Sequence, residues 1–343
     1  MKYKTLILTM LATFMSAFIF TSAPAQATSN RNCQEIQVPV ALAAGLPKTE
    51  RLAGQLCLPP TWPEDGQVDV LVAGTSYDRN YWDFGYNSSQ YSYVDKTLAE
   101  GRATFTFDRL GTGKSSRPLS ATFTATSSAH TIHEAIQWLR REKAFEKVNL
   151  IGHSLGSAIS VEEAATYQDV DKLVLTGFSN MLNISNSLPG VLGLRPALLD
   201  PVLKNKGYLD SGYMTTAPST RPNIFYGIPM DPAIIAYDEA RKTAFSAAEL
   251  GTGLASLEVP APLNISQRVT APTFIILGSQ DKIFCGGLID CTSVDNFTEY
   301  HQSYFSQAAS FQAAIVPNTG HALTTVPSAQ QSFQIIDDWL SGN

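Results

Sequence analysis

The sequence predicts an α/β fold, in which a mostly parallel central sheet is covered by helices on both faces and carries an inserted cap. Three observations support this prediction. Short apolar runs of strand length alternate with helix-like stretches, which is typical of parallel sheets with two covered faces. One run ends in the motif Gly-x-Ser-x-Gly at residues 152–156. The interval between the runs at 172–176 and 273–277 is far longer than one connecting helix requires.

Six apolar runs are the expected parallel strands. In chain order they occupy residues 69–73, 103–107, 148–151, 172–176, 273–277 and 311–316. Helices are expected between them, including one at residues 129–142 and a last one at residues 327–340. In that last stretch Phe333, Ile336 and Leu340 recur at the spacing of one helix face.

The motif Gly152-His153-Ser154-Leu155-Gly156 follows the run at 148–151 directly. A strand that ends in this pattern and leads into a helix predicts a nucleophile elbow, in which a sharp turn exposes the serine at the edge of the sheet. Such a turn strains the backbone at Ser154 and crowds the positions two residues before and after it. Glycine at 152 and 156 removes the side chains that would clash there. Ser154 is therefore the candidate nucleophile.

A serine hydroxyl needs a base at neutral pH, and the base needs an acid to orient it. His321 lies in a Gly-His loop just after the run at 311–316, and Asp281 follows the run at 273–277. Catalytic residues of open parallel sheets collect where the strands end. Each residue alone is typical of a solvated loop. Together with the elbow, in the order Ser154, Asp281 and His321, they indicate a catalytic triad.

From about residue 34 to residue 340 the chain resembles the α/β-hydrolase superfamily through these motifs and their order. The resemblance implies that residues 35–41 and 52–58 form the antiparallel strands that open the fold. It also implies a serine hydrolase in which Ser154 attacks the substrate through an acyl-enzyme. Epoxide hydrolases and haloalkane dehalogenases are disfavoured, because those relatives need an aspartate where Ser154 stands.

The same resemblance implies an oxyanion hole built from two backbone N–H groups. Relatives often carry His-Gly-x after the third strand, and the N–H of x is one donor. This chain has Ala73-Gly74-Thr75, so Thr75 is the expected donor and Ser76 the alternative. Leu155, directly after the nucleophile, is expected to supply the second. The loop at 108–115 matches the family's Asp-x-x-Gly-x-Gly-x-Ser and is expected to support the site.

Two further motifs suggest other chemistry and are rejected. Gly113-Lys114-Ser115 resembles the end of a nucleotide-binding P-loop, but Asp108 stands where that motif needs glycine and would repel phosphate. His130 and His133 share a helix face with Glu134 nearby, yet the spacing fits no common zinc pattern. The expectation is that the protein uses no metal and no cofactor.

The first residues predict export. Lys2 and Lys4 precede an apolar stretch that ends in Ala25-Gln26-Ala27, which is the pattern of a secretory signal peptide at residues 1–27. The hydrolase domain is then expected at residues 28–343, outside the cytosol and without a stable membrane anchor. Removal of the two lysines changes the formal net charge from −6 to −8. This charge disfavours nucleic acids and anionic membrane surfaces as partners.

If the protein is exported, its four cysteines are expected to form disulfides, because disulfides persist outside the cytosol. Four cysteines allow three pairings, between which the sequence alone does not decide. A hairpin centred on Gly45 would place Cys33 opposite Cys57. Cys285 and Cys291 flank a pair of glycines that can form a turn. The preferred disulfides are therefore Cys33–Cys57 and Cys285–Cys291.

The long interval before the run at 273–277 predicts a cap over the active site at about residues 179–268. Some of its apolar side chains should line a substrate pocket. The most concrete interpretation is a secreted hydrolase of small-molecule carboxylic esters. Lactonase, aminopeptidase and perhydrolase activities on the same triad remain alternatives, as does a non-catalytic binding protein with this fold. Substrate chain length, stereochemical preference and oligomeric state stay open.

Overall fold

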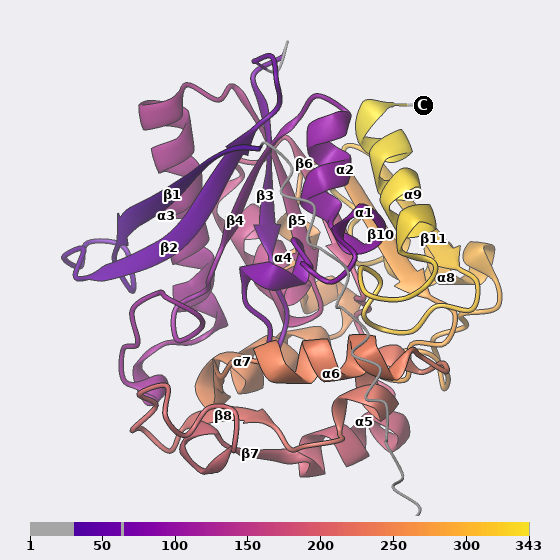
Figure 1. The fold of residues 1–343 in the computed structure, drawn as a ribbon. Helices are drawn as coiled ribbons and strands as arrows, with labels where there is room; N and C mark the ends of the chain where they lie inside the picture. Colours follow the sequence, from indigo (N-terminus) through magenta and orange to yellow (C-terminus); the bar gives the residue numbers. More distant parts are fainter. Residues whose placement is uncertain (1–30, 63–64, 343) are drawn as a thin grey trace, which may run out of the picture.

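The computed structural model describes residues 31–62 and 65–342. Its centre is an eight-stranded sheet of order β1-β2-β4-β3-β5-β6-β10-β11 (Figure 1). The strands are β1 (Asn32–Val40), β2 (Glu50–Leu58), β3 (Gln67–Val72), β4 (Ala103–Phe107), β5 (Lys147–His153), β6 (Lys172–Thr176), β10 (Thr273–Gly278) and β11 (Phe311–Val316). β2 runs antiparallel to both of its neighbours, and every pair from β4 to β11 is parallel. The predicted mostly parallel sheet is confirmed, with strand ends that differ by a few residues.

Helices cover both faces of the sheet. α3 (Ala125–Lys143) and α4 (Leu155–Tyr167) pack on one face, with α8 (Val294–Gln302) beside β11. α1 (Ser88–Tyr91), α2 (Tyr93–Ala99) and α9 (Ala329–Ser341) cover the other face. Side chains of β10 alternate between the two cores, with Ile275 and Leu277 on one side and Phe274 and Ile276 on the other. The apolar run at residues 273–277 is continuous because both faces of β10 are buried.

The helix expected at 129–142 begins four residues earlier, at Ala125. Thr124 caps it by accepting a hydrogen bond from the N–H of Ser127. The first turn, Ala-Thr-Ser-Ser, contains little apolar surface, so hydrophobic spacing could not mark the start.

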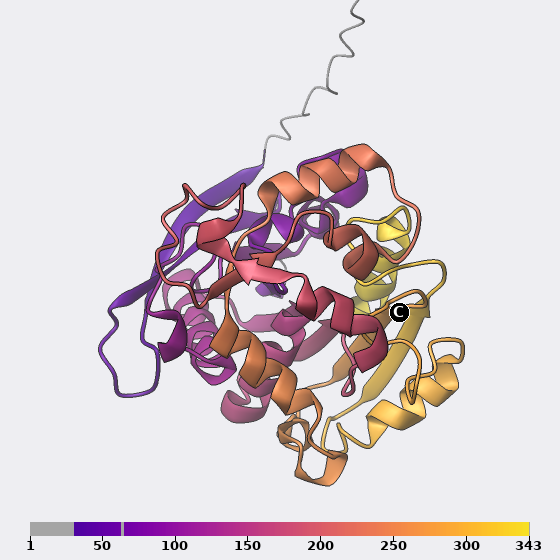
Figure 2. The same ribbon diagram turned by 90° about the horizontal axis from the view of Figure 1, so that it is seen from below.

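The long interval between β6 and β10 folds over the carboxyl ends of the parallel strands, as Figures 1 and 2 show. We call residues 179–268 the cap segment. Its helices are α5 (Ile184–Leu192), α6 (Pro232–Arg241) and α7 (Ala247–Leu257). Its strands β7 (Leu194–Pro196), β8 (Tyr213–Thr216) and β9 (Phe245–Ser246) form a small antiparallel sheet. Many cap side chains belong to the same two cores as the sheet, so the cap segment packs as part of the domain.

Both expected disulfides are present. In the hairpin of β1 and β2 the backbone register places Cys33 directly opposite Cys57, and their sulfur atoms are bonded. The turn of this hairpin contains Gly45 in the left-handed region at φ 80°. Cys285 and Cys291 are bonded in the loop that follows β10. The described residues contain no free cysteine.

The proposed signal peptide, residues 1–27, lies outside the described residues. Within the described part of the chain, no helix combines the length and the apolar character needed to cross a bilayer.

Candidate active site

Ser154 occupies a strained turn between β5 and α4. Its backbone angles are φ 55° and ψ −121°, outside the regions that most residues adopt. A Cβ on Gly156 would lie 2.5 Å from the carbonyl oxygen of Val72, and a Cβ on Gly152 would lie 2.6 Å from the Cα of Ser157. Both distances are too short for any residue but glycine. The turn therefore has the geometry that the motif predicts, with Ser154 at the carboxyl edge of the sheet.

His321 and Asp281 form a buried pair at the same edge. Nδ1 of His321 lies 2.7 Å from Oδ2 of Asp281. The other carboxylate oxygen, Oδ1, accepts hydrogen bonds from the N–H groups of Ile283, at 2.8 Å, and Phe284, at 3.3 Å. The carboxylate of Asp281 accepts a hydrogen bond from the N–H of Nδ1, which leaves Nε2 of His321 as the nitrogen without a proton. Within the described residues this buried Nε2 has no hydrogen-bond partner.

A cavity lies beside the predicted catalytic residues. Ser154 lines it together with Phe225 and Phe284, whose rings lie 5.9 Å and 5.8 Å from the His321 ring between centroids. No hydrogen bond joins Ser154 Oγ to His321 Nε2 among the described residues. Such bonds are often long before substrate binds and shorten in the reactive complex.

The turn after β3 lies against Ser154. A Cβ on Gly74 would sit 2.9 Å from the Cβ of Ser154, so the backbone at Gly74 passes directly beside the serine. Thr75 lines the cavity. Ser76 is fully buried, and its Oγ accepts a hydrogen bond from Nη1 of Arg221 at 2.7 Å. Of the two candidate donors, Thr75 therefore faces the cavity. Leu155 is the first residue of α4, where backbone N–H groups have no partner within the helix.

Comparisons with known proteins agree with this architecture. A family model described as "alpha/beta hydrolase fold" matches residues 84–201, a segment that includes Ser154 but ends before Asp281 and His321. Over 90% of this chain, the structure is similar to a thermostable carboxyl esterase from Bacillus coagulans, with a TM-score of 0.63, 17% identity and 98% of that chain covered. The chain has the α/β-hydrolase fold.

Two further solved structures share this fold with similar coverage. One is an esterase from Thermogutta terrifontis, with a TM-score of 0.58, 15% identity, and 90% of this chain and 98% of that chain covered. The other is an esterase from Exiguobacterium antarcticum, with a TM-score of 0.58, 15% identity, and 90% and 100% covered.

One curated relative matches a shorter segment. This is Abhydrolase domain-containing protein abhd-5.2 from Caenorhabditis elegans, 33% identical over 102 residues. The matched segment covers 29% of this chain and 23% of that protein.

His153, inside the elbow, packs beneath the site in the interior of the α/β-hydrolase fold. His153 is fully buried and stacks on Tyr81, with ring centroids 4.2 Å apart and an angle of 13°. Its Nδ1 lies 3.1 Å from the hydroxyl of Thr176. Burial, together with the neighbouring His321, holds the pKa of His153 well below its usual value. His153 is therefore neutral and adds no charge beneath His321. The sequence carries no signal for this role, because the middle positions of the elbow motif accept any residue.

The cavity itself is apolar and uncharged. Cap residues such as Leu250 and Leu254 line it together with Phe225, and its polar side chains are all serine or threonine. Among the described lining residues none carries a charge. The volume is about 100 Å³.

The loop at 108–115 supports the site and leaves no room for a phosphate. The carboxylate of Asp108 accepts hydrogen bonds from the N–H groups of Arg79, at 3.2 Å, and Lys114, at 2.8 Å. Ser115 accepts one from the N–H of Ala53 at 2.8 Å. A Cβ on Gly113 would lie 2.1 Å from Asp108 Oδ2, so the loop closes around its own carboxylate.

His133 lies in a cluster with Glu163 and Asp169, two residues that are distant from it in the sequence. Its Nδ1 is 2.8 Å from Asp169 Oδ2, and the buried Glu163 lies within 4.8 Å of both residues' ligand atoms. Burial and the nearby Asp169 raise the pKa of Glu163 well above its ordinary value. A neutral Glu163 can donate a hydrogen bond to the carboxylate of Asp169.

Proposed function

We propose that the protein is a serine hydrolase that cleaves carboxylic esters through an acyl-enzyme. The observation that carries the proposal is the buried pair of His321 and Asp281, whose free Nε2 lies at the edge where Ser154 is held in a strained turn. A protein that only binds ligands needs neither the strain nor an unpaired basic nitrogen. The solved structures with the same fold include several that are named esterases, which supports the same activity.

The proposed reaction has two halves. Ser154 Oγ attacks the ester carbonyl carbon while His321 Nε2 takes its proton, and His321 then gives that proton to the departing alcohol. Asp281 stabilises the imidazolium that forms between these steps. A water molecule, deprotonated by His321, next attacks the acyl-enzyme, and Ser154 recovers its proton as the acid leaves. In both halves the N–H groups of Thr75 and Leu155 stabilise the negative oxygen of the tetrahedral intermediate.

The cavity favours neutral substrates of modest size. An aminopeptidase has to recognise a charged α-amino group, and among the described residues the apolar lining with its few hydroxyl groups offers no carboxylate for that purpose. Esters and lactones are neutral and suit the lining. Lactone hydrolysis and perhydrolysis use the same triad and oxyanion donors, so substrate panels have to separate them.

We also propose that the protein acts outside the cytosol. The signal-peptide pattern at residues 1–27 supports export, and two disulfides suit an oxidising compartment. N-terminal sequencing of the secreted protein tests this, with Thr28 expected as the first residue.

Labelling with a fluorophosphonate probe tests the proposed function directly. The probe is expected to modify wild-type protein at Ser154, as located by peptide mass spectrometry, and to leave Ser154→Ala unlabelled. A panel of p-nitrophenyl esters and lactones then gives the substrate class. Absence of both labelling and hydrolysis in folded wild-type protein would instead indicate a binding protein.

A further inference from the structure

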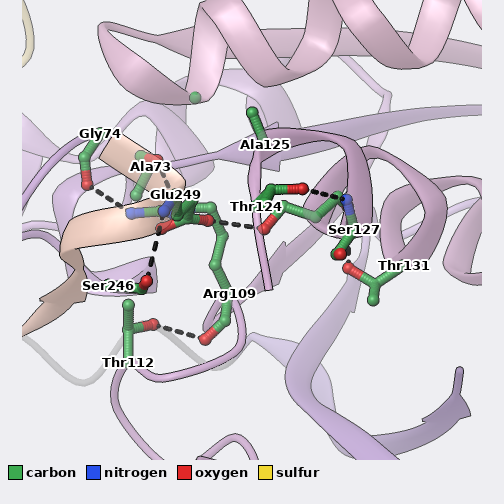
Figure 3. A network of polar contacts seen from close by, with 12 residues as sticks. Ala73, Gly74, Arg109, Thr112, Thr124, Ala125, Ser127, Thr131, Ser246 and Glu249 are labelled. Carbon is green, nitrogen blue, oxygen red and sulfur yellow. Dashed lines mark hydrogen bonds and ion pairs between the residues drawn. The ribbon is translucent and has the colours of Figure 1, made fainter. Parts of the chain in front are cut away.

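Arg109 contacts the turn that carries the expected oxyanion donor. It lies two residues after the end of β4 and is almost completely buried. Its Nε donates to the carbonyl oxygen of Ala73 at 3.0 Å, and its Nη2 donates to that of Gly74 at 3.0 Å. Figure 3 shows the guanidinium group beside both carbonyl groups. One side chain thus holds two consecutive peptide units of the turn.

The direction of the Thr75 N–H follows from this contact. The carbonyl of Gly74 and the N–H of Thr75 belong to one planar trans peptide, so they point in opposite directions. Arg109 fixes the carbonyl, and the N–H of Tyr77 also donates to it at 3.3 Å. Because Gly74 lies directly against Ser154, the opposite end of this peptide is held next to the nucleophile.

A carboxylate from the cap segment holds Arg109 in place. Glu249 on α7 is fully buried, and its carboxylate pairs with Nη1 of Arg109 (Figure 3). The same carboxylate accepts a hydrogen bond from Ser128 on α3 at 2.6 Å. A buried guanidinium without a countercharge is strongly unfavourable, so Glu249 allows Arg109 to remain at this place.

A second arginine holds the far end of the turn. Arg221 in the cap segment forms two hydrogen bonds with Asp238, at 2.8 Å and 2.7 Å, and donates to Ser76 Oγ. The N–H of Thr243 donates to the carbonyl oxygen of Ser76 at 3.1 Å. The turn therefore cannot rotate as a whole, and Arg109 decides the orientation of the peptide nearest Ser154.

We propose that Arg109 is a positioning residue of the oxyanion hole, which aims the N–H of Thr75 at the substrate oxygen, and that Glu249 secures it from the cap. This role rests on the proposed ester hydrolysis.

The test compares Arg109→Lys with wild type on a soluble p-nitrophenyl ester. A lysine keeps the charge next to Glu249 but cannot hold both carbonyl groups in one planar contact. We expect kcat to fall about 100-fold, near the lower end of what loss of one oxyanion donor costs. KM should change by less than about twofold, since the donor acts mainly on the transition state. Affinity for a trifluoromethyl ketone, whose adduct places an oxyanion in the hole, should fall by the same factor as kcat/KM.

Arg102→Lys is the matched control. Arg102 is also buried and pairs with two carboxylates, Asp69 at 3.3 Å and Asp337 at 2.5 Å, but it lies at the opposite end of β4. We expect Arg102→Lys to lose about as much thermal stability as Arg109→Lys and to keep the wild-type kcat. Glu249→Gln, which preserves shape and removes charge, provides a second variant if Arg109→Lys does not fold, and should lower kcat several-fold.

The outcomes separate the two proposals. Wild-type protein that neither hydrolyses esters nor reacts with a fluorophosphonate overturns the proposed function and the role of Arg109 with it. Active wild-type protein together with Arg109→Lys and Glu249→Gln variants of unchanged kcat and unchanged ketone affinity overturns the positioning role alone. A parallel loss in Arg102→Lys would assign the effect to general stability and overturn it too.

Discussion

The backbone at Ser154 combines strain with exposure of the hydroxyl group. A non-glycine residue at φ 55° and ψ −121° costs about 1–3 kcal/mol, which the surrounding packing has to offset. Ser154, the candidate nucleophile, lines the cavity from this turn. Function here is associated with a local cost in stability.

Replacement of Ser154 separates these two properties. Ser154→Ala should remain folded and lose about 10⁶-fold in kcat. Ser154→Gly should be equally inactive but at least as stable as Ser154→Ala, because glycine adopts this conformation freely. Elsewhere an alanine-to-glycine change in regular structure costs about 0.5–1 kcal/mol. Thermal unfolding of the two variants makes the comparison, and a less stable glycine variant would argue against strain at this position.

At the level of single elements, the loop after β10 connects a disulfide to the candidate acid. The N–H of Cys285 donates to the carbonyl oxygen of Asp281 at 2.9 Å, and Cys285 is bonded to Cys291 six positions later. The disulfide therefore restrains the loop that orients His321.

The double variant Cys285→Ser, Cys291→Ser should lower the free energy of unfolding by about 2 kcal/mol through loop-closure entropy. It should also lower kcat, because Asp281 loses part of its support. The pair Cys33→Ser, Cys57→Ser is the control, since it lies in the β1–β2 hairpin and closes a longer loop. It should cost about 3 kcal/mol and leave kcat unchanged. Denaturant titration and ester assays measure both, and equal kcat values in the two variants would contradict the link to Asp281.

Some elements of this fold could be predicted from the sequence and others could not. The strands β4 and β6 were predicted with the ends they have, because aromatic, β-branched and aliphatic residues fill most of their length and all but Lys172 are buried. The interior of the cap segment was not, since β7 and β9 contain three and two residues, too few for a periodic pattern. Arg109 and Glu249 were missed for another reason. They are 140 positions apart (249 − 109), and a contact of that kind leaves no local signal.

For the whole molecule, buried neutral histidines determine the response to acid. His301 on α8 donates from Nδ1 to the carbonyl of Phe297 and accepts from the hydroxyl of Ser179, an arrangement that requires the neutral ring. Burial lowers its pKa from the ordinary 6.5 to about 4. His153 is shifted in the same direction.

Because the folded pKa is depressed, the unfolded chain binds more protons below pH 6.5. Stability should therefore be complete above that pH and fall as pH decreases through 4, by about 3 kcal/mol for His301 alone. His301→Gln, which can retain both hydrogen bonds, should show a smaller decrease. Unfolding free energies between pH 7 and pH 4 test this, and identical slopes for the variant and wild type would exclude His301 as the source.

The cap segment and the sheet share their buried cores, which limits how a substrate can enter the cavity and how a product can leave it. Tyr208, Tyr213, Leu257, Phe225 and Tyr226 of the cap segment are buried in them. Exposing five such side chains would cost roughly 10 kcal/mol, comparable to the stability of a whole domain. α5 is different, because none of its residues is buried although it borders the cavity.

Substrate traffic should accordingly pass through a fixed portal near α5, with no hinged opening of the whole cap. Hydrolysis of an ester series should rise with acyl length and then fall once the cavity is filled. An abrupt rise above the solubility limit of the substrate would contradict a fixed portal. In such a protein the width of the entrance, rather than the chemistry of the triad, selects which esters are cleaved, and bulky alcohol products should leave slowly enough to limit turnover.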